Sequence, residues 1–562
     1  MKNHFKAINK DNLVVQVLIK NKFNILILVG FSLIASFSEL IFLKDMPTFV
    51  DDLLKGSTVD KSFITRQLIL IIIWTFFGIL FRFKLPNLIA LISKDLSYLI
   101  FTNIGSLSLK RIENIGKSKI TTLSSLYLDN VINGICHPLL RLVEIFLTII
   151  VGIIVILLSL GLTALPIIFL GFTGLILLIY ITKYKSYEYG LIDSRMANKS
   201  VLTLNFFIEN IKEIILQKDP SPYSSRFSQV LYNRYFANGK ATFLGDLPRK
   251  ILETLLYLFI CFIGLFNFIK TSNFSDSIPS LAVSLLVLQR ITPLFQSAYR
   301  SCFSIINMMP ILEEYNFENS FKVFQQNYLI QSKSENNRNS NIYTQKITAI
   351  EISNLSIGHR KKELYNINRL SIKQGNPLVI VGKSGSGKTT LVETIIGLRP
   401  PISGICNFYN KDKILNSYRN ISYVPQTVQL TGETLFEMIS FDNKNLINYR
   451  NNKKIERYLS HILEICCIKN DFIKSFNDLH KPINENATSI SGGQRQRIAI
   501  ARALLRGNGI IVLDEATNGL DEHLEEIVIS NIVNELSSKI LICVTHSRGL
   551  TKYFKNVLSL TS

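Results

Sequence analysis

The residues best suited to chemistry stand together in an octet in the C-terminal half of the chain. The octet follows an apolar run at 378–381 and precedes a helix-like stretch at 390–396, and it consists of Gly382, Lys383, Ser384, Gly385, Ser386, Gly387, Lys388 and Thr389. Glycines allow the backbone to curl until successive N–H groups point inward, and the helix N-terminus adds a partial positive charge. The octet therefore predicts a phosphate-binding loop between a strand and a helix.

Two side chains of this loop would have defined tasks. Lys388 would reach the β- and γ-phosphates of a nucleotide, and the Thr389 hydroxyl would help to hold Mg²⁺, with Thr390 beside it in the helix. The alternative is a chance glycine- and serine-rich loop, which the flanking strand and helix patterns disfavour. The predicted cofactors are ATP and Mg²⁺.

A pair of carboxylates follows a second apolar run at 510–513. Asp514 would bind Mg²⁺ through water, and Glu515 would polarise the water that attacks the γ-phosphate. An acidic pair after a strand is common and does not identify an ATPase by itself. Just upstream, however, Ile490 is followed by Ser491, Gly492, Gly493 and Gln494.

With this run the chain resembles the ATP-binding cassette (ABC) family, whose signature usually has Leu where Ile490 stands. The resemblance implies that Ser491, Gly492, Gly493 and Gln494 contact ATP held by the phosphate loop of a second cassette. One chain contains one cassette, so the resemblance implies a dimer with two bound ATP molecules. Because the signature, Glu515 and His546 are all intact, both sites of a homodimer would be competent.

The resemblance also assigns residues outside the signature. Gln426 corresponds to the Q-loop glutamine, which contacts Mg²⁺ or water, and His546 to the switch histidine, which hydrogen-bonds the γ-phosphate. Asp521 ends the D-loop, in which Asn518 and Gly519 replace the usual Ser-Ala.

Two further positions follow from the same resemblance. His359 stands where the family stacks an aromatic ring on adenine, and an imidazole stacks less strongly than a tyrosine ring. Glu485 matches a glutamate that the exporter branch places near its coupling helices.

The composition indicates a membrane half and a soluble half. Of the 562 residues, 48% are hydrophobic and 18% charged, and the long uncharged runs lie in about the first 300. The net charge is +21, but the sequence contains no basic stripe with interleaved aromatic residues. Membrane lipids are therefore expected as partners, and nucleic acid is not. The seven cysteines lack metal-ligand spacing and predict reduced thiols: Cys136, Cys261, Cys302, Cys406, Cys466, Cys467 and Cys543.

Six apolar stretches are each near the ~20 residues that a bilayer requires. They lie at roughly 24–43, 66–85, 139–160, 163–182, 250–269 and 280–300. The first starts without a cleavage site and is expected to be an anchor rather than a signal peptide. Lysines and arginines gather in the N-terminal tail and at 183–250, which predicts both termini on the cytoplasmic side of a bacterial inner membrane.

We interpret the connections between spans on the cytoplasmic side as polar helices that extend the spans. Solvated loops are the alternative. We expect a break at Gly116 before a helical pattern, and one amphipathic segment over 208–216 with Ile208, Ile211, Ile215 and Leu216 on one side. The resemblance makes the stretches near 114–122 and 211–216 the coupling helices of the exporter architecture.

The predicted fold is an α-helical membrane domain of exporter type, with six transmembrane helices and domain-swapped bundles, followed by an α/β P-loop NTPase cassette. The predicted domains are 1–325 for the membrane domain, 326–345 for a polar linker and 346–562 for the cassette. Six spans fused ahead of one cassette resemble a half-size ABC exporter, which implies an ATPase-coupled transporter working by alternating access.

Polar residues within the spans are the candidates for substrate contact. Arg290 and Glu39 lie deepest, whereas five others lie nearer the cytoplasmic face, where snorkelling or pairing within the bundle is the alternative: Arg82, Arg141, Glu144, Glu253 and Arg300. Of these, Arg82 and Arg300 join Arg290 and Glu39 as substrate candidates. An arginine-lined cavity suits a phosphate or diphosphate.

A weaker resemblance, to the bacterial lipid-linked oligosaccharide flippase, rests on 36–39, 248–253 and 289–293. It implies a polyprenyl-diphosphate-linked glycan or another anionic lipid as substrate. The alternatives are a multidrug or peptide exporter of the same architecture, and an ATP-gated or regulatory membrane protein. The six spans exclude a soluble ATPase for DNA or ribosomes, and the fusion of spans and cassette in one chain disfavours an importer.

Overall fold

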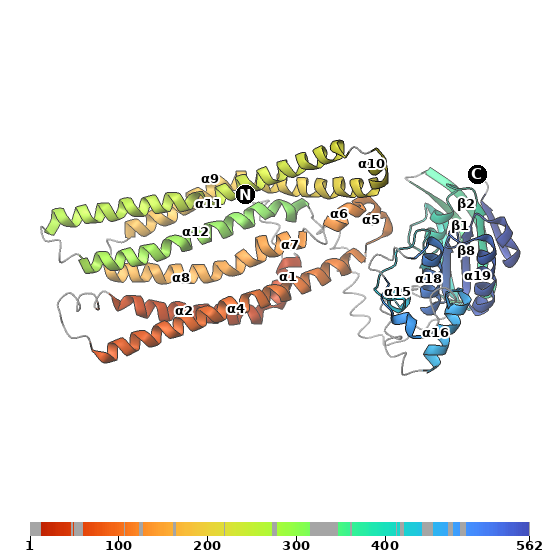
Figure 1. The fold of residues 1–562 in the computed structure, drawn as a ribbon, viewed down its shortest axis with the longest axis horizontal. Helices are drawn as coiled ribbons and strands as arrows, with labels where there is room; N and C mark the ends of the chain where they lie inside the picture. The colour runs from red at the N-terminus through yellow and green to blue at the C-terminus, as the bar shows by residue number, and fades with distance from the viewer. Residues whose placement is uncertain are drawn as a thin grey trace. The chain divides into compact units, whose positions relative to one another are not determined.

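The computed structural model describes residues 13–46, 49, 60–105, 107–122, 127–160, 165–217, 220–271, 278–314, 347–359, 362–411, 413–415, 421–440, 453–469, 476–483 and 490–560. They form two compact units, an N-terminal helical unit and a C-terminal α/β unit, which are described separately (Figure 1). The predicted linker at 326–345 lies outside the described residues and stays a prediction.

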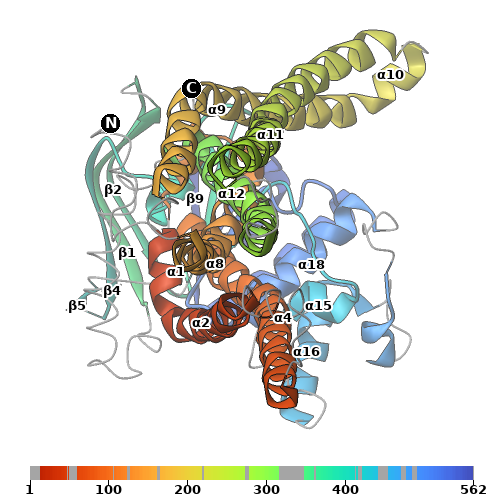
Figure 2. The same cartoon turned by 90° about the vertical axis from the view of Figure 1, so that its left-hand side faces the viewer.

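The helical unit is built from long helices joined by short ones. In chain order they are α1 (Leu13–Lys20), α2 (Lys22–Lys44), α4 (Lys61–Gly105), α5 (Leu109–Ile115), α6 (Lys117–Thr122), α7 (Leu128–Val131), a π-helical turn (Ile132–Cys136), α8 (His137–Leu160), α9 (Leu165–Glu209), α10 (Ile211–Gln217), α11 (Ser221–Thr271) and α12 (Ile278–Glu314). Within this unit α2 packs on α4, α8 on α12, and α9 on α11 (Figure 2).

The described residues of each predicted span lie within a helix. Among the described residues, three helical stretches are long and apolar enough to cross a membrane: Lys22–Lys44, Lys61–Gly105 and Leu128–Val155. The other three predicted spans lie in α9, α11 and α12. Large apolar side chains on the outside of α2 and α4 suit a lipid environment, where no hydrophobic penalty attaches to their exposure: Phe23, Leu26, Leu68, Ile72, Phe76 and Phe83.

Helices, rather than loops, continue the spans on the side of the inner connections. Both α4 and α9 run for 45 residues and α11 for 51, about twice the length that a bilayer needs. Gly116 has a φ of +85° and separates α5 from α6, which confirms the predicted break. Glycine fits this left-handed conformation because it has no Cβ.

The segment predicted to be amphipathic over 208–216 spans the end of α9 and most of α10. The chain leaves α9 after Glu209 and starts α10 at Ile211. At this junction the Asn210 side chain donates a hydrogen bond to the Phe206 carbonyl at 2.7 Å, beside the backbone bond from Asn210 N to the same carbonyl at 3.2 Å. Among the described side chains of α10, Ile214 is buried, whereas Leu216 is 82% exposed.

The C-terminal unit has two sheets. The strands β1 (Ala349–His359), β2 (Lys362–Lys373), β4 (Ser403–Asn410) and β5 (Lys413–Ile414) form an antiparallel sheet in the order β2-β1-β4-β5. The strands β3 (Leu378–Gly382), β6 (Ile421–Val424), β7 (Ile510–Asp514), β8 (Ile540–Thr545) and β9 (Asn556–Leu560) form a parallel sheet in the order β6-β7-β8-β3-β9. Strands alternating with helices confirm the predicted α/β fold of this part.

Helices cover the parallel sheet and complete its core. They are α14 (Lys388–Ile395), α15 (Leu435–Ser440), α16 (Lys453–Ile465), α18 (Gly492–Leu505) and α19 (Glu522–Glu535), with short 3₁₀ turns at Phe476–His480, Leu536–Ser538 and Arg548–Tyr553. Leu378 and Ile380 of β3 pack in the cluster shared with α14 and the antiparallel sheet, while Val379 and Val381 pack in the cluster of α18 and α19. This alternation is the two-residue period of a strand buried on both faces.

Candidate functional site

The order of the parallel strands gathers the predicted site residues at one edge. Gln426 follows β6, Glu515 follows β7, His546 follows β8, and Gly382 ends β3, and these four strands are neighbours in the sheet. In parallel sheets the carboxyl ends of adjacent strands lie together, and ligands bind outside them. Residues up to 164 positions apart in the sequence are therefore brought into contact.

The phosphate-binding loop has the predicted strand–loop–helix form between β3 and α14. Gly385 and Gly387 have φ values of +79° and +84°, in the left-handed region that favours glycine. Lys388 starts α14, is 4% exposed, and donates to the carbonyls of Gly382 and Lys383 at 3.0 and 3.1 Å. The Ser386 hydroxyl is buried and has no hydrogen-bond partner in the described part of the chain.

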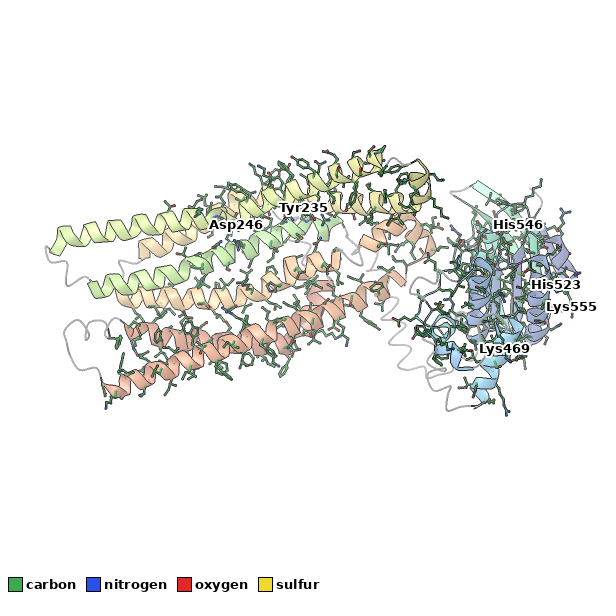
Figure 3. The ribbon with its side chains drawn as sticks, viewed as in Figure 1. Tyr235, Asp246, Lys469, His523, His546 and Lys555 are labelled. Carbon is green, nitrogen blue, oxygen red and sulfur yellow. The ribbon has the colours of Figure 1, made fainter. Side chains whose placement is uncertain are left out.

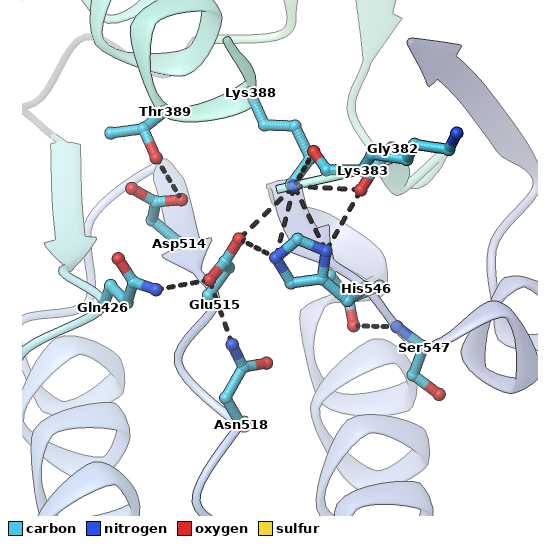
Figure 4. A network of polar contacts seen from close by, with 11 residues as sticks. Gly382, Lys383, Lys388, Thr389, Gln426, Asp514, Glu515, Asn518, His546 and Ser547 are labelled. Atoms are coloured by element: carbon cyan, nitrogen blue, oxygen red, sulfur yellow. Dashed lines mark hydrogen bonds and ion pairs between the residues drawn. The ribbon is translucent and has the colours of Figure 1, made fainter. Parts of the chain in front are cut away.

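Glu515 is the centre of a closed polar network (Figure 4). Its Oε1 lies 2.5 Å from His546 Nε2 and 3.4 Å from Lys388 Nζ. Its Oε2 accepts hydrogen bonds from Gln426 Nε2 at 2.6 Å and from Asn518 Nδ2 at 3.0 Å. Both carboxylate oxygens are thus occupied, and Lys388 and His546 also lie 3.3 Å from each other.

Asp514 forms a second polar cluster beside Glu515. It accepts hydrogen bonds from Thr389 Oγ1 at 3.3 Å and from the Tyr423 hydroxyl at 2.8 Å. Burial raises the pKa of the Asp514 carboxyl, and the two hydrogen bonds partly oppose this shift. Burial and the neighbouring Asp514 also raise the pKa of Tyr423.

These groups fit ATP and Mg²⁺. A hydroxyl and a carboxylate 3.3 Å apart, Thr389 and Asp514, are the oxygen ligands that Mg²⁺ prefers. The unpartnered Ser386 hydroxyl and the Lys388 ammonium are the donors that a phosphate needs. Lys383, Ser384 and Thr390 belong to the same loop and helix start.

The signature residues form the start of α18. Ser491 caps the helix: its hydroxyl accepts from Gln494 N at 3.2 Å, and Ser491 N donates to Gln494 Oε1 at 3.0 Å. Gly493 touches the D-loop, because a Cβ at this position would lie 2.6 Å from the Gly519 carbonyl oxygen. Asp521, predicted to contact nucleotide, caps α19 through a hydrogen bond from Leu524 N at 2.9 Å.

Three contacts were missed by reasoning from the sequence. The contacts of Asn518 with Glu515 and of Tyr423 with Asp514 were not predicted. Gln496 accepts a hydrogen bond from Gly519 N at 2.8 Å and so ties α18 to the D-loop. The polar replacement of the usual D-loop serine by Asn518 was the one available signal.

The remaining predicted residues are separated in space or lie outside the described part. The side chains of His359, Arg290 and Glu253, and the whole of Glu485, are not among the described groups. Arg300 on α12 donates to Asp246 on α11 at 2.7 Å, so pairing within the bundle accounts for it. Figure 3 labels Asp246 in the helical unit. Glu39 and Arg82 line one cavity of the helical unit, together with Glu144.

A glycine-rich loop between strand and helix, with a lysine, a threonine and an acidic pair at the ends of neighbouring parallel strands, defines a P-loop NTPase. Comparison with known proteins specifies the class further. Residues 365–518 match the family model "ABC transporter". The C-terminal unit therefore contains an ABC cassette, as the resemblance implied.

Relatives are similar over about a third of the chain. A "Putative export ATP-binding/permease protein" of Rickettsia bellii is 33% identical over 217 residues, which cover 37% of this chain and 36% of the relative. An "ATP-dependent lipid A-core flippase" of Neisseria meningitidis is 34% identical over 204 residues, or 35% of this chain and 31% of the relative. The matched part of the chain thus spans about a third of the length of these relatives.

The whole chain has the fold of an ABC exporter. The solved structure of "a bacterial Atm1-family ABC exporter with ATP bound" superposes with a TM-score of 0.73 at 16% sequence identity, covering 97% of this chain and 94% of that chain. The comparisons together show an ABC cassette in the C-terminal unit and, over the whole chain, the fold of an ABC exporter.

Proposed function

We propose that the chain is an ATP-driven exporter or flippase that moves an amphipathic substrate from the cytoplasmic side of the membrane outward. The observation that carries the proposal is the Glu515 cluster, in which the carboxylate lies 2.5 Å from His546 and 3.4 Å from Lys388. A regulatory protein would not need this set of hydrolytic groups, whereas a transporter that turns over ATP does.

Hydrolysis requires a carboxylate beside the attacking water. Before Glu515 acts as this base, its Oε1 releases Lys388 and His546, and these two side chains become available to the phosphates. Its Oε2 stays hydrogen-bonded to Gln426 and Asn518. Thr389 and Asp514 would hold Mg²⁺, which neutralises charge on the phosphate oxygens when bound.

Two copies of the chain would form the working unit. Ser491 and Gly492 are exposed at the N-terminus of α18, where backbone N–H groups favour an anion. We assign them to the ATP held by the phosphate loop of a partner chain, so that a homodimer encloses two nucleotides. Both termini lie on the cytoplasmic side of a bacterial inner membrane, because the Lys- and Arg-rich connections belong there.

The substrate is proposed to be a lipid or lipid-linked molecule, which the relatives named lipid A-core flippase support. The finer hypothesis is a polyprenyl-diphosphate-linked glycan or another anionic lipid, held by Arg82 and Arg290. A multidrug or peptide exporter of the same architecture is the second candidate, since Glu39 and Glu144 share a cavity with Arg82 and would suit cationic compounds.

The test is ATP turnover and lipid translocation by the purified chain in liposomes. We expect Glu515→Gln to lower turnover by roughly 10²–10⁴-fold and to abolish translocation. Glu535→Gln is the matched control, because Glu535 pairs with His461 away from the site. Turnover that survives in Glu515→Gln would contradict the assigned base, and wild-type protein without any turnover would support a regulatory role.

A further inference from the structure

The D-loop turns back on the residue proposed as the catalytic base. Asn518 N donates a hydrogen bond to the Glu515 carbonyl at 3.3 Å, and Leu520 N donates to the Thr517 carbonyl at 2.9 Å. Because these two bonds fold the chain into consecutive tight turns, the Asn518 side chain lies beside the Glu515 carboxylate (Figure 4). A residue of the base's own turn is therefore available to control the orientation of that carboxylate.

Two side-chain amides share one oxygen of this carboxylate. Glu515 Oε2 accepts hydrogen bonds from Asn518 Nδ2 at 3.0 Å and from Gln426 Nε2 at 2.6 Å. A carboxylate only accepts hydrogen bonds, so each amide must present its NH2 group and not its carbonyl oxygen. Rotation about the last torsion of a glutamate would exchange its two oxygens. With Oε2 held, Oε1 is the oxygen directed at Lys388 and His546.

The two amides belong to different parts of the cassette. Gln426 follows β6 and reaches Glu515 from a neighbouring strand, and the family resemblance gives it a second task at Mg²⁺ or water. Asn518 instead lies in the same turn as Glu515 and is tied to it by the backbone bond of that turn. Of the two donors, Asn518 is thus the one whose position is set together with that of the base.

Hydrogen bonds on both sides hold the Asn518 backbone, although the residue itself is exposed. Thr517 is 2% exposed, and its hydroxyl donates to Glu525 Oε1 at 2.6 Å in a buried contact. On the other side, Gly519 N donates to Gln496 Oε1 at 2.8 Å. A side chain whose backbone is fixed in this way keeps its geometry, so an exposed hydrogen bond can still orient the carboxylate.

Asn518 and Gly519 depart from the usual D-loop sequence as a pair. A Cβ at position 519 would lie 2.8 Å from Gln496 Oε1, so the usual alanine would displace Gln496 and break its bond to the Gly519 N–H. Glycine at 519 therefore allows Gln496 to anchor the turn. Asparagine at 518 is longer than the usual serine and carries the NH2 donor that reaches Glu515. One arrangement accounts for both replacements.

We propose that Asn518 is a positioning residue for Glu515, which holds Oε2 and keeps Oε1 directed at the reacting groups. In the hydrolytic step the water oxygen bonds to the γ-phosphorus, the bond to the ADP oxygen breaks, and the proton of the water passes to Oε1. The inference rests on the proposed ATP hydrolysis and deepens it. Since Gln496 lies on α18, the anchor of Asn518 also ties the base to the helix that the signature residues begin.

The test is steady-state ATP hydrolysis by the full-length chain in liposomes, with kcat and the KM for ATP determined separately. We expect Asn518→Ala to lower kcat roughly tenfold and to leave KM within about twofold of the wild type, because the lost bond orients the base and does not contact ATP. Asn518→Asp has the same size but places a like charge against Oε2, so it should lower kcat at least as far. Asn534→Ala is the matched control, since Asn534 is an exposed asparagine near the end of α19, and it should behave like the wild type.

A double-mutant cycle separates positioning from a structural role. In single-turnover measurements, Asn518→Ala should change the residual rate of Glu515→Gln by less than about twofold, because no base is left to orient. An equal fold-loss in both backgrounds would assign Asn518 to the fold of the cassette and overturn the inference, as would an unchanged kcat or a raised KM in Asn518→Ala.

Gly519→Ala tests the anchor and should reproduce the loss in kcat, because its methyl group displaces Gln496. A wild-type rate in this variant would overturn the anchoring by Gln496. The proposed function is tested separately by Glu515→Gln alone. If Glu515→Gln loses turnover and Asn518→Ala does not, only the positioning role fails, whereas wild-type turnover in Glu515→Gln would reject the assigned base itself.

Discussion

Glu515 has a left-handed backbone, with a φ of +51°, although it is not glycine. Such a conformation costs of order 1–3 kcal/mol and persists where the surroundings fix it. Here Glu515 N donates to the Val544 carbonyl at 3.0 Å, which continues the ladder between β7 and β8. The strained turn aims the carboxylate at Lys388 and His546, so the backbone, and not only the side chain, is specialised for this position.

The neighbouring Asp514 gives a prediction at the scale of single residues. Its pKa is raised by burial, and the hydrogen bond from Tyr423 opposes the rise. Tyr423→Phe removes this donor and raises the pKa further, so a larger fraction of Asp514 is protonated as the pH falls. Since Mg²⁺ needs the carboxylate, we expect the Mg²⁺ concentration for half-maximal ATPase activity to increase up to about tenfold.

The sign of the pH dependence is fixed by the direction of this shift. Mg²⁺ binding is complete above the raised pKa and is lost as the pH falls through it, so the variant should differ more from the wild type near pH 6 than near pH 8. Magnesium titrations at both pH values check this. Tyr409→Phe on β4 serves as the control, and an identical Mg²⁺ dependence of Tyr423→Phe and wild type would refute the role of Tyr423.

At the scale of secondary-structure elements, α18 begins with a residue that has both a structural and a functional role. Ser491 is both its N-cap and the first signature residue. Loss of an N-cap costs about 1 kcal/mol, so Ser491→Ala should lower the melting temperature of the cassette in the full chain by roughly 2–4 °C without nucleotide. Calorimetry or far-UV circular dichroism would measure the shift in melting temperature.

The control is Ser530→Ala, because Ser530 lies inside α19, where alanine is a good helix former. Its melting temperature should equal or exceed that of the wild type. If Ser491→Ala melts like Ser530→Ala, the cap contributes nothing, and any loss of activity in Ser491→Ala belongs to nucleotide contact alone.

Features that depend on a few adjacent residues were predictable from the sequence. The phosphate loop, the strand before Asp514 and the break at Gly116 each follow from local propensity and glycine conformation. The contact of Asn518 with Glu515 depends on how the D-loop folds back, and the meeting of Glu39, Arg82 and Glu144 depends on how three helices pack. Nothing in local spacing specifies such packing.

At the scale of the whole molecule, the proposed dimer predicts complementation. Lys388→Ala removes the phosphate loop's cation, and Ser491→Arg blocks the signature, so each variant alone should be inactive. A mixture contains heterodimers in which the intact phosphate loop of one chain meets the intact signature of the other. We expect ATPase activity to return in the mixture, measured after co-reconstitution in liposomes.

Mixing Lys388→Ala with Glu515→Gln is the informative control. Both changes affect the same half of each site, so every site in that mixture carries a defect and activity should stay absent. Activity recovered in neither mixture would mean that the phosphate loop and signature of one chain do not serve different copies, which would reject the proposed dimer.

The closed network around Lys388 makes Glu515 an internal competitor of the nucleotide. Its carboxylate occupies the ammonium and the imidazole that the γ-phosphate would otherwise meet. The apparent dissociation constant of ATP is then the intrinsic constant divided by the fraction of molecules in which this contact is open. A glutamine at this position competes less because it carries no charge, so Glu515→Gln should bind ATP more tightly than wild type, and its affinity should change less with ionic strength.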